Sequence, residues 1–187
     1  MISDKKIVEG CIAGKRKAFN MLYKKYSAVM LGVCLRYCKS YEEAEDVLQE
    51  GFIKVFNNIG KFRMDGSFEG WIRRIMVNTA INNYHANLKY YYQENVDEME
   101  ESKDLGTIRN EDVKYNGRLP KEKLMSLIQS LPDGYRMVFN MFAIEGYSHK
   151  EIADILEISV NTSKSQLSKA RRTLKKQIKE LEKKYNY

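Results

Sequence analysis

The chain has 187 residues, of which 43% are hydrophobic and 30% charged, an apolar share that can fill a core and argues against a fully disordered protein. Lysine and arginine number 32 against 25 acids, and this surplus of +7 is typical of proteins with an anionic partner such as nucleic acid. No apolar run approaches the ~18 residues of a membrane span and no signal peptide follows Met1, so we expect a cytoplasmic chain that is not embedded in a membrane.

Hydrophobic residues recur at spacings of three and four along the first half of the chain, which predicts helices rather than strands. Ile12, Tyr23 and Val29 are among the residues that these stripes place on the apolar faces. Residues 61–70 are polar and contain glycine, so a loop is expected there. Residues 1–92 are therefore predicted to form a helical domain with short loops.

The composition changes after residue 92. Residues 93–119 contain eight acids and four bases, a net −4 that leaves +11 for the rest of the chain. Large apolar residues are scarce in this segment, which predicts a flexible acidic linker. Either a solvated tether or a segment that occupies a basic channel of a partner fits this composition.

Helical signals return at Pro120, and residues 120–187 are predicted to form a second small domain. The fold class is therefore all-α, with two helical domains joined by the linker. A turn is expected at residues 131–134, in which Pro132 fixes φ and Gly134 accepts a positive φ.

The most specific local pattern is a short helix, a tight turn and a long basic helix, as in a DNA-binding helix-turn-helix. Ser148 and Glu151 have the spacing of a capping box, and Ser159 is suited to cap the helix that follows it. The outer face of the second helix carries hydroxyl, amide and basic groups that suit base edges and phosphates. A solvated basic helix is the alternative that the charge pattern alone would favour.

The three cysteines do not indicate a disulfide framework, since their number is odd and no secretion signal is present. Cys34 and Cys38 lie four residues apart, and we interpret them as small core-facing residues rather than metal ligands. The sequence contains no phosphate-binding glycine loop, nucleophile elbow or metal-spaced histidine and cysteine cluster. We therefore expect no catalytic residues, metal site or cofactor, and no enzyme activity.

Ordered motifs add a family resemblance. Residues 44–56, reading Ala-Glu-Asp-Val-Leu-Gln-Glu-Gly-Phe-Ile-Lys-Val-Phe, resemble region 2 of bacterial sigma factors, and residues 68–82 look like the promoter-melting region that follows it. Motifs at 131–136, 145–153 and 162–171 resemble region 4. Their order is similar to that of the extracytoplasmic-function (ECF) sigma factors, the small two-domain group. The resemblance implies a sigma factor that binds core RNA polymerase, recognises −35 and −10 promoter elements and assists DNA melting.

The resemblance also implies site residues. Polymerase docking falls on a polar helical stripe of Asp46, Gln49, Glu50 and Lys54. Contact with the −10 element, as single-stranded DNA with a flipped base, falls on Arg63, Asp65, Ser67, Arg73, Arg74, Asn78 and Asn82. Contact with the −35 element, as duplex, falls on Asn161, Thr162, Lys164, Ser165, Ser168, Lys169 and Arg171. An anti-sigma factor, commonly membrane-anchored in this group, is a further expected partner.

Several residues keep two interpretations. Trp71 is expected to pack in the core, and Tyr84 with Tyr90–Tyr92 either stack on unpaired bases or pack plainly on the surface. Gln166 and Lys169 stand where relatives commonly have arginine, which affects the choice of −35 bases. The competing hypothesis for the whole chain is a free-standing helix-turn-helix regulator that binds duplex DNA as a dimer.

Overall fold

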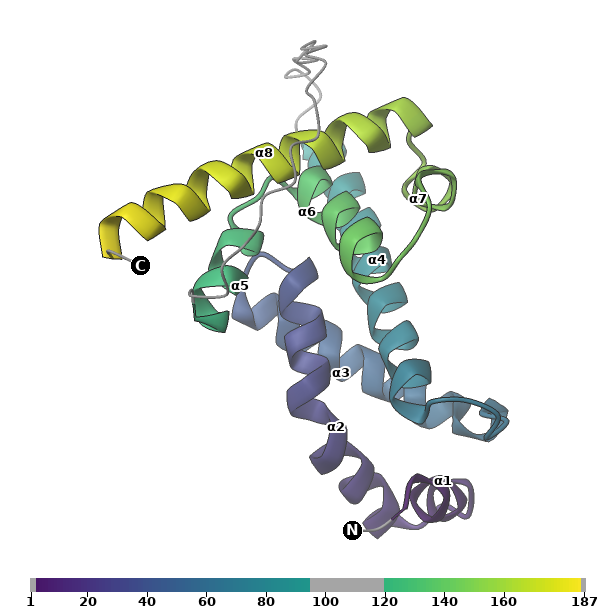
Figure 1. Cartoon of the computed structure of the whole chain (residues 1–187). Helices are drawn as coiled ribbons and strands as arrows, with labels where there is room; N and C mark the ends of the chain where they lie inside the picture. Colours follow the sequence, from purple (N-terminus) through teal and green to yellow (C-terminus); the bar gives the residue numbers. More distant parts are fainter. Residues whose placement is uncertain (1–2, 95–119, 186–187) are drawn as a thin grey trace. The chain divides into compact units, whose positions relative to one another are not determined.

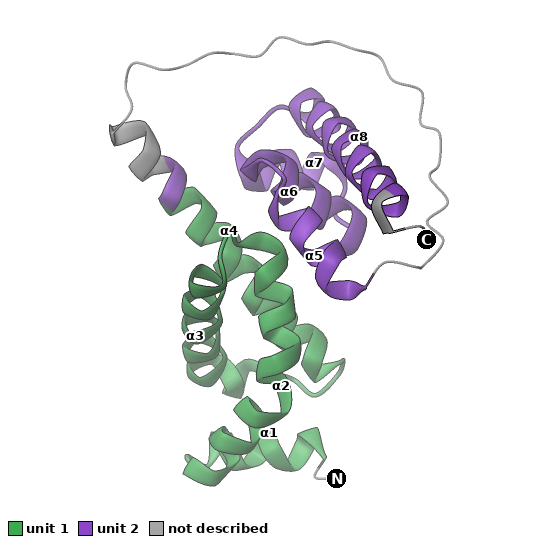
Figure 2. Ribbon diagram, turned by 90° about the vertical axis from the view of Figure 1, so that its left-hand side faces the viewer, with its two compact units in different colours: residues 1–86 green, residues 87–187 purple. Residues whose placement is uncertain are grey.

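The computed structural model describes residues 3–94 and 120–185, and all regular structure within those ranges is helical, as predicted (Figure 1). The chain divides into two compact units, residues 1–86 and 87–187 (Figure 2). Apart from Gln93 and Glu94, which continue a helix, the predicted linker lies outside the described residues. None of the described helices is both long and apolar enough to cross a membrane.

From residue 3 onward, where the structure describes it, the first unit has four α-helices and one short 3₁₀ turn. These are α1 (Asp4–Ile12), α2 (Arg16–Tyr37), α3 (Tyr41–Asn58), η1 (Ile59–Lys61) and α4 (Phe68–Glu94), the last of which runs past residue 86. Local chemistry sets the helix ends. Gly14, with φ of 69°, closes α1 in a Schellman motif in which the Lys15 amide donates to the Gly10 carbonyl. The Ser40 hydroxyl accepts a hydrogen bond from the Glu43 amide and so caps α3.

The core of the first unit follows the predicted stripes with three exceptions. Ile12, Tyr23 and Val29 are 58%, 42% and 46% exposed, because each lies at the edge of a stripe where the helical period of 3.6 turns it toward solvent. The prediction for Cys34 and Cys38 is confirmed, since both are buried. Burial raises the pKa of the Cys34 thiol to about 12, which suppresses its reactivity.

The second unit contains the predicted helix-turn-helix. Its elements are α5 (Lys121–Gln129), α6 (Asp133–Phe139), a π-helical turn η2 (Asn140–Ile144), α7 (His149–Leu156) and α8 (Val160–Tyr185). The inner face of α8 supplies the core of this unit: Ala170 and Leu174 pack with Leu127 of α5 and with Leu131, and Ile178 and Leu181 pack against this cluster.

The junction between α5 and α6 differs from its predicted form. Gly134 does not adopt a positive φ; it lies in the first turn of α6, where a Cβ would come within 2.9 Å of the Gln166 amide nitrogen. The glycine therefore makes room for a side chain of α8 rather than turning the chain. The turn itself is held by Arg136, 3% exposed, whose guanidinium donates to the Leu131 carbonyl at 2.9 Å and to Asp133 at 2.7 Å.

Candidate nucleic-acid interface

An exposed stripe runs along α3. Asp46, Gln49 and Glu50 of the predicted docking set are all exposed on this helix. Ile53 lies three and four residues beyond Glu50 and Gln49 and is 58% exposed, so it adds an apolar centre to the stripe. The sequence contained this signal as an apolar residue at the spacing of the polar ones, but Ile53 was not among the predicted residues.

Lys54 lies in a different environment from the other predicted docking residues. Its side chain is half-buried, and its ammonium lies 2.6 Å from Glu50 and 3.4 Å from the Thr79 hydroxyl of α4. Thr79 is itself buried and donates to the Ile75 carbonyl at 2.9 Å. Lys54 therefore connects the exposed face of α3 with α4.

The same lysine lines a pocket of about 370 Å³ in the first unit. The pocket is formed by the end of α3, the η1 turn and α4, through Lys54, Asn58, Lys61, Trp71, Ile75, Asn78, Thr79 and Asn82. Asn78 and Asn82, which the sequence predicted as a pair on one helix face, are both exposed and share this pocket. Asn58 was not predicted, although it lies one helical turn beyond Lys54 and donates to that residue's carbonyl at 2.8 Å.

The pocket combines an aromatic wall, three carboxamides and two ammonium groups. Trp71 is half-buried, so it has only part of the core role predicted for it. Its ring centroid lies 5.5 Å from that of Phe62 and 5.9 Å from that of Phe68. A carboxamide both donates and accepts hydrogen bonds, as the edge of an unpaired base requires, and an aromatic face stacks on any base. Lys54 and Lys61 supply positive charge suited to a phosphate backbone.

The loop before α4 is shorter than predicted. The helix begins at Phe68, inside the expected loop of residues 61–70, because the Ser67 hydroxyl accepts a hydrogen bond from the Gly70 amide at 3.1 Å. Arg63 and Asp65 are exposed on the loop, and neither lines the pocket of Asn58, Asn78 and Asn82, which we call the asparagine pocket. Ser67 is also absent from that pocket and acts as a cap.

The remaining predicted −10 residues lie on α4. Arg74 is exposed, while Arg73 is half-buried and lies 3.9 Å from Glu69. Tyr84 is half-buried on the same helix. The side chains of Tyr90–Tyr92 lie outside the described residues.

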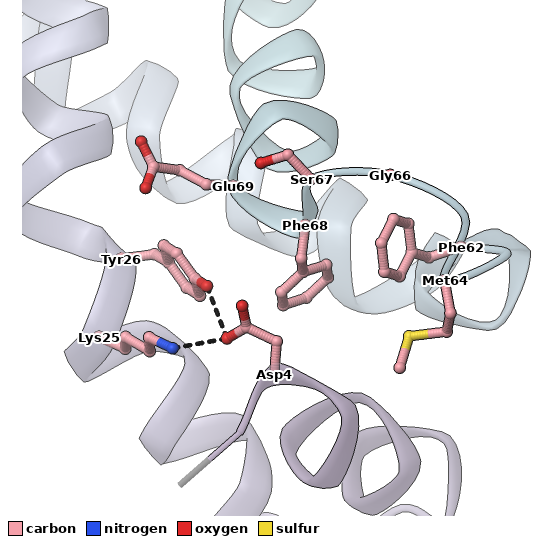
Figure 3. Close-up of a pocket in the computed structure, with 9 residues that line it drawn as sticks. All are labelled: Asp4, Lys25, Tyr26, Phe62, Met64, Gly66, Ser67, Phe68 and Glu69. Carbon is pink, nitrogen blue, oxygen red and sulfur yellow. Dashed lines mark hydrogen bonds and ion pairs between the residues drawn. The ribbon is translucent and has the colours of Figure 1, made fainter. Parts of the chain in front are cut away.

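A second pocket, of about 400 Å³, is lined by residues of α1 and α2 together with Phe62, Phe68 and the loop before α4 (Figure 3). Asp4 accepts hydrogen bonds from Lys25 at 2.6 Å and from Tyr26 at 2.7 Å. Burial opposes ionisation of Asp4, but these two bonds and the charge of Lys25 outweigh it and lower the pKa of the carboxyl. With Glu69 this pocket holds two carboxylates, whereas the lining of the asparagine pocket has none, so a phosphate-bearing strand favours the asparagine pocket.

The helix-turn-helix of the second unit has the predicted caps. The Glu151 amide donates to the Ser148 hydroxyl, and the Glu151 carboxylate accepts from the Ser148 amide at 2.8 Å, which completes the capping box. The carboxylate also accepts from the Ser148 hydroxyl at 2.7 Å, and the two bonds donated by the Ser148 amide and hydroxyl lower the pKa of the Glu151 carboxyl. Glu157 ends α7 with φ of 55°, and the Ser159 hydroxyl accepts from the Thr162 amide at 2.9 Å, which caps α8.

The outer face of α8 presents the predicted −35 residues to different extents. Asn161, Lys164, Ser165 and Arg171 are exposed, and Thr162, Ser168 and Lys169 are half-buried. Two hydroxyls are held locally: Thr162 shares a hydrogen bond with Ser159, and Ser165 donates to the Thr162 carbonyl at 3.0 Å. Gln166, which stands where relatives commonly have arginine, is half-buried beside Gly134, and its Oε1 is buried. Its side chain therefore packs against the second unit.

A cluster of side chains links α7, α8 and the π-helical turn. The His149 ring stacks on Phe142 with centroids 4.5 Å apart, and its Nδ1 shares a 2.9 Å hydrogen bond with the buried hydroxyl of Ser163. The Arg171 guanidinium lies 5.7 Å from the centroid of the Phe142 ring, within the range of a cation–π contact. Desolvation, Lys164 and Arg171 together lower the pKa of His149.

Comparisons with known proteins match both units. Residues 22–88 match the model of sigma-70 region 2, and residues 121–174 match that of sigma-70 region 4. The chain is 33% identical over 185 residues to the ECF RNA polymerase sigma-E factor of Haemophilus influenzae, which covers 96% of this chain and 97% of that protein. It is 30% identical over 183 residues to the RNA polymerase sigma-H factor of Pseudomonas aeruginosa, with 95% of each chain covered.

A solved structure shares the fold. The sigma factor RpoE of Bartonella quintana, determined in complex with the anti-sigma factor NepR, superposes with a TM-score of 0.50 at 18% identity, over 87% of this chain and 98% of that one. The family matches set aside the hypothesis of a free-standing regulator, because that class has no region 2. The chain belongs to the ECF sigma factors of the sigma-70 family, the subunits that give RNA polymerase its promoter-specific transcription initiation.

Proposed function

We propose that the asparagine pocket of the first unit captures one unpaired base of the −10 element during promoter melting. The observation that carries this assignment is the convergence of Asn58, Asn78 and Asn82 with the Trp71 ring in one pocket. Extrusion of a base costs a few kcal/mol, which stacking and paired hydrogen bonds in such a pocket offset. Lys54 and Lys61 bind the adjoining phosphates, together with the exposed Arg63 and Arg74.

The stripe of Asp46, Gln49, Glu50 and Ile53 on α3 is the surface that docks on core polymerase. Its support is an exposed apolar side chain surrounded by polar and acidic ones, the arrangement of a small interface centre with a charged rim. The acidic groups steer the chain toward a basic partner surface and fix its register. In this assignment Lys54 belongs to the DNA pocket and contributes less to docking.

The outer face of α8 reads the −35 duplex. Lys164 and Asn161 are exposed near the start of that helix, the end that enters the major groove in helix-turn-helix proteins. Thr162 and Arg171 contact phosphates, and Ser165, Ser168 and Lys169 complete the face. The second unit thus supplies duplex recognition, and the first supplies single-strand capture.

The chain acts in the cytoplasm, where polymerase and promoter DNA are found, and catalyses no covalent step itself. An anti-sigma factor is its expected regulator, in keeping with the complex in which the Bartonella quintana protein was solved. Such a partner would act by covering the α3 stripe or the outer face of α8.

A double-mutant cycle between protein and DNA tests the pocket directly. Holoenzyme reconstituted from core polymerase and this chain is titrated with single-stranded −10 oligonucleotides in which each base in turn is replaced by an abasic residue. In the wild type, we expect an abasic residue at one position to reduce the binding affinity. On that oligonucleotide Asn78→Ala should cause almost no further loss of affinity, because both changes remove the same contacts. Asn57→Ala, at an exposed asparagine of α3 outside the pocket lining, is the matched control. Fully additive effects of Asn78→Ala at every position would refute the assignment.

A further inference from the structure

The His149 cluster lies beside the proposed −35 face but has no role in base reading. The ring is held on two sides, by the stack on Phe142 and by the hydrogen bond to Ser163, so it joins the first turn of α7 to the first turn of α8. Because Ser163 is fully buried, this bond fixes how the start of α8 sits on the rest of the unit. Removal of the ring would leave the buried Ser163 hydroxyl without this bond, which is unfavourable.

The charges that act on this ring belong to the surface that meets DNA. Lys164 and Arg171, both on α8 and both exposed, disfavour the protonated imidazole. The π-helical turn contributes the neutral Phe142 ring, over which the Arg171 guanidinium also lies. The half-buried imidazole therefore stacks on an aromatic ring, shares a hydrogen bond with a hydroxyl and lies in the positive field of two cations.

We propose that His149 is a proton-linked positioning residue for −35 recognition, which orients the start of α8 through Ser163 and takes up a proton when DNA phosphates bind beside Lys164 and Arg171. The phosphates cancel the positive field of the two cations and add a negative field of their own. The protonated ring then has a favourable partner that it lacks in free protein. This inference rests on the proposed −35 role of α8.

The sign of the pH dependence follows from linkage. Since the charged form of His149 is more favourable in the complex than in the free chain, binding takes up protons and affinity rises as pH falls. The gain begins below the pKa of the bound state and is complete below the lowered pKa of the free state. One additional charge contact near a phosphate gives about a two- to fivefold increase in affinity.

The test measures binding of holoenzyme to a labelled −35 duplex at constant ionic strength, between about pH 5 and pH 8, the range in which histidine titrates. The duplex is selected from a randomised library with the wild-type holoenzyme. We expect the two- to fivefold gain at the acidic end for the wild type and for His85→Gln, the control at the other histidine of the chain. His149→Gln, which keeps a hydrogen-bonding group but cannot be protonated, should bind equally at both ends.

Two further measurements separate the possible failures. Lys164→Ala should weaken duplex binding at every pH; if it does not, the proposed −35 face is wrong, whatever the histidine does. If Lys164→Ala weakens binding but the wild type has no pH dependence, or His149→Gln retains it, only the role of His149 is overturned. NMR titration of the His149 ring in the free and DNA-bound wild-type chain needs no variant, and a bound pKa equal to or below the free one would contradict the proposal.

Discussion

At the scale of single residues, the structure gives two glycines of similar sequence context opposite roles. Gly51 lies where α3 crosses α4, and a Cβ added there would overlap the Sδ atom of Met76. Gly32 lies inside α2, where an added Cβ would meet nothing within 4 Å. Helix propensity alone would favour alanine at both positions, so only the tertiary contact distinguishes them.

Gly51→Ala should therefore destabilise the first unit by about 1–3 kcal/mol, the cost of overpacking a filled core. Gly32→Ala should stabilise it by about 0.5–1 kcal/mol, because alanine loses less backbone entropy in a helix. Denaturant unfolding followed by fluorescence of Trp71, the one tryptophan of the chain, measures both. Equal effects of the two substitutions would contradict the close approach of α3 and α4.

Arg136 holds together the junction between α5 and α6 in the second unit. It is a buried charge whose hydrogen bonds go to Gln129, Leu131 and Asp133, so it closes the end of α5 onto the start of α6. Arg136→Ala removes these hydrogen bonds and the ion pair with Asp133, and should cost about 3–5 kcal/mol. Circular dichroism should detect early loss of helix while the Trp71 transition stays in place. The exposed Arg172→Ala is the control, and a joint shift of both signals would contradict a role confined to the second unit.

At the scale of elements, much of the fold was predictable because helical periodicity and capping chemistry act locally. The capping box at Ser148 and the cap at Ser159 need only the residues of one turn, and both predictions are confirmed. The start of α4 was misplaced because the Ser67 cap was not recognised inside a polar segment. Gly134 was misinterpreted because its reason lies in Gln166, more than thirty residues away, which no local pattern reports.

The candidate site was predictable in its helix faces but not in its grouping. Asn78 and Asn82 were found from their spacing of four, but Asn58 and Lys61 reach the same pocket from another helix end and a 3₁₀ turn. Lys54 shares the spacing of the docking stripe, yet its half-buried position places it in the pocket lining. Such convergence depends on how the helices pack against one another, and the hydrophobic periodicity of a single helix does not predict that packing.

The docking face of α3 gives the prediction that belongs to this scale. Ile53→Ala should weaken binding to core polymerase by about tenfold, because a buried apolar side chain at the centre of an interface contributes more than its rim. Stability should stay nearly unchanged, since Ile53 is 58% exposed in the free chain. Tyr41→Ala, at a 51% exposed aromatic residue in the first turn of the same helix, is the control. Loss of core binding by both variants alike would move the interface away from the stripe.

At the scale of the whole molecule, the proposed DNA contacts divide between the two units. Single-strand capture is assigned to residues of α3, η1 and α4, and duplex recognition to α8. Joining two DNA contacts on one chain raises their joint affinity through effective concentration. In the proposed division both units therefore act together, and the cost of opening the duplex falls on the contacts of the first unit alone.

The most direct test of this division compares transcription from duplex and pre-melted promoters. Core polymerase is combined with the wild type or with the Asn78→Ala, Asn82→Ala double variant, on the same promoter either fully paired or with an unpaired −10 region. At saturating holoenzyme, we predict a loss of about tenfold or more on the duplex, from one to three kcal/mol of missing base contacts that no longer favour the open state. The loss on the pre-melted template should be much smaller, because its strands are already apart and saturation offsets the weaker binding. An equal loss on both templates, or none on the duplex, would contradict the capture of a melted base by this pocket.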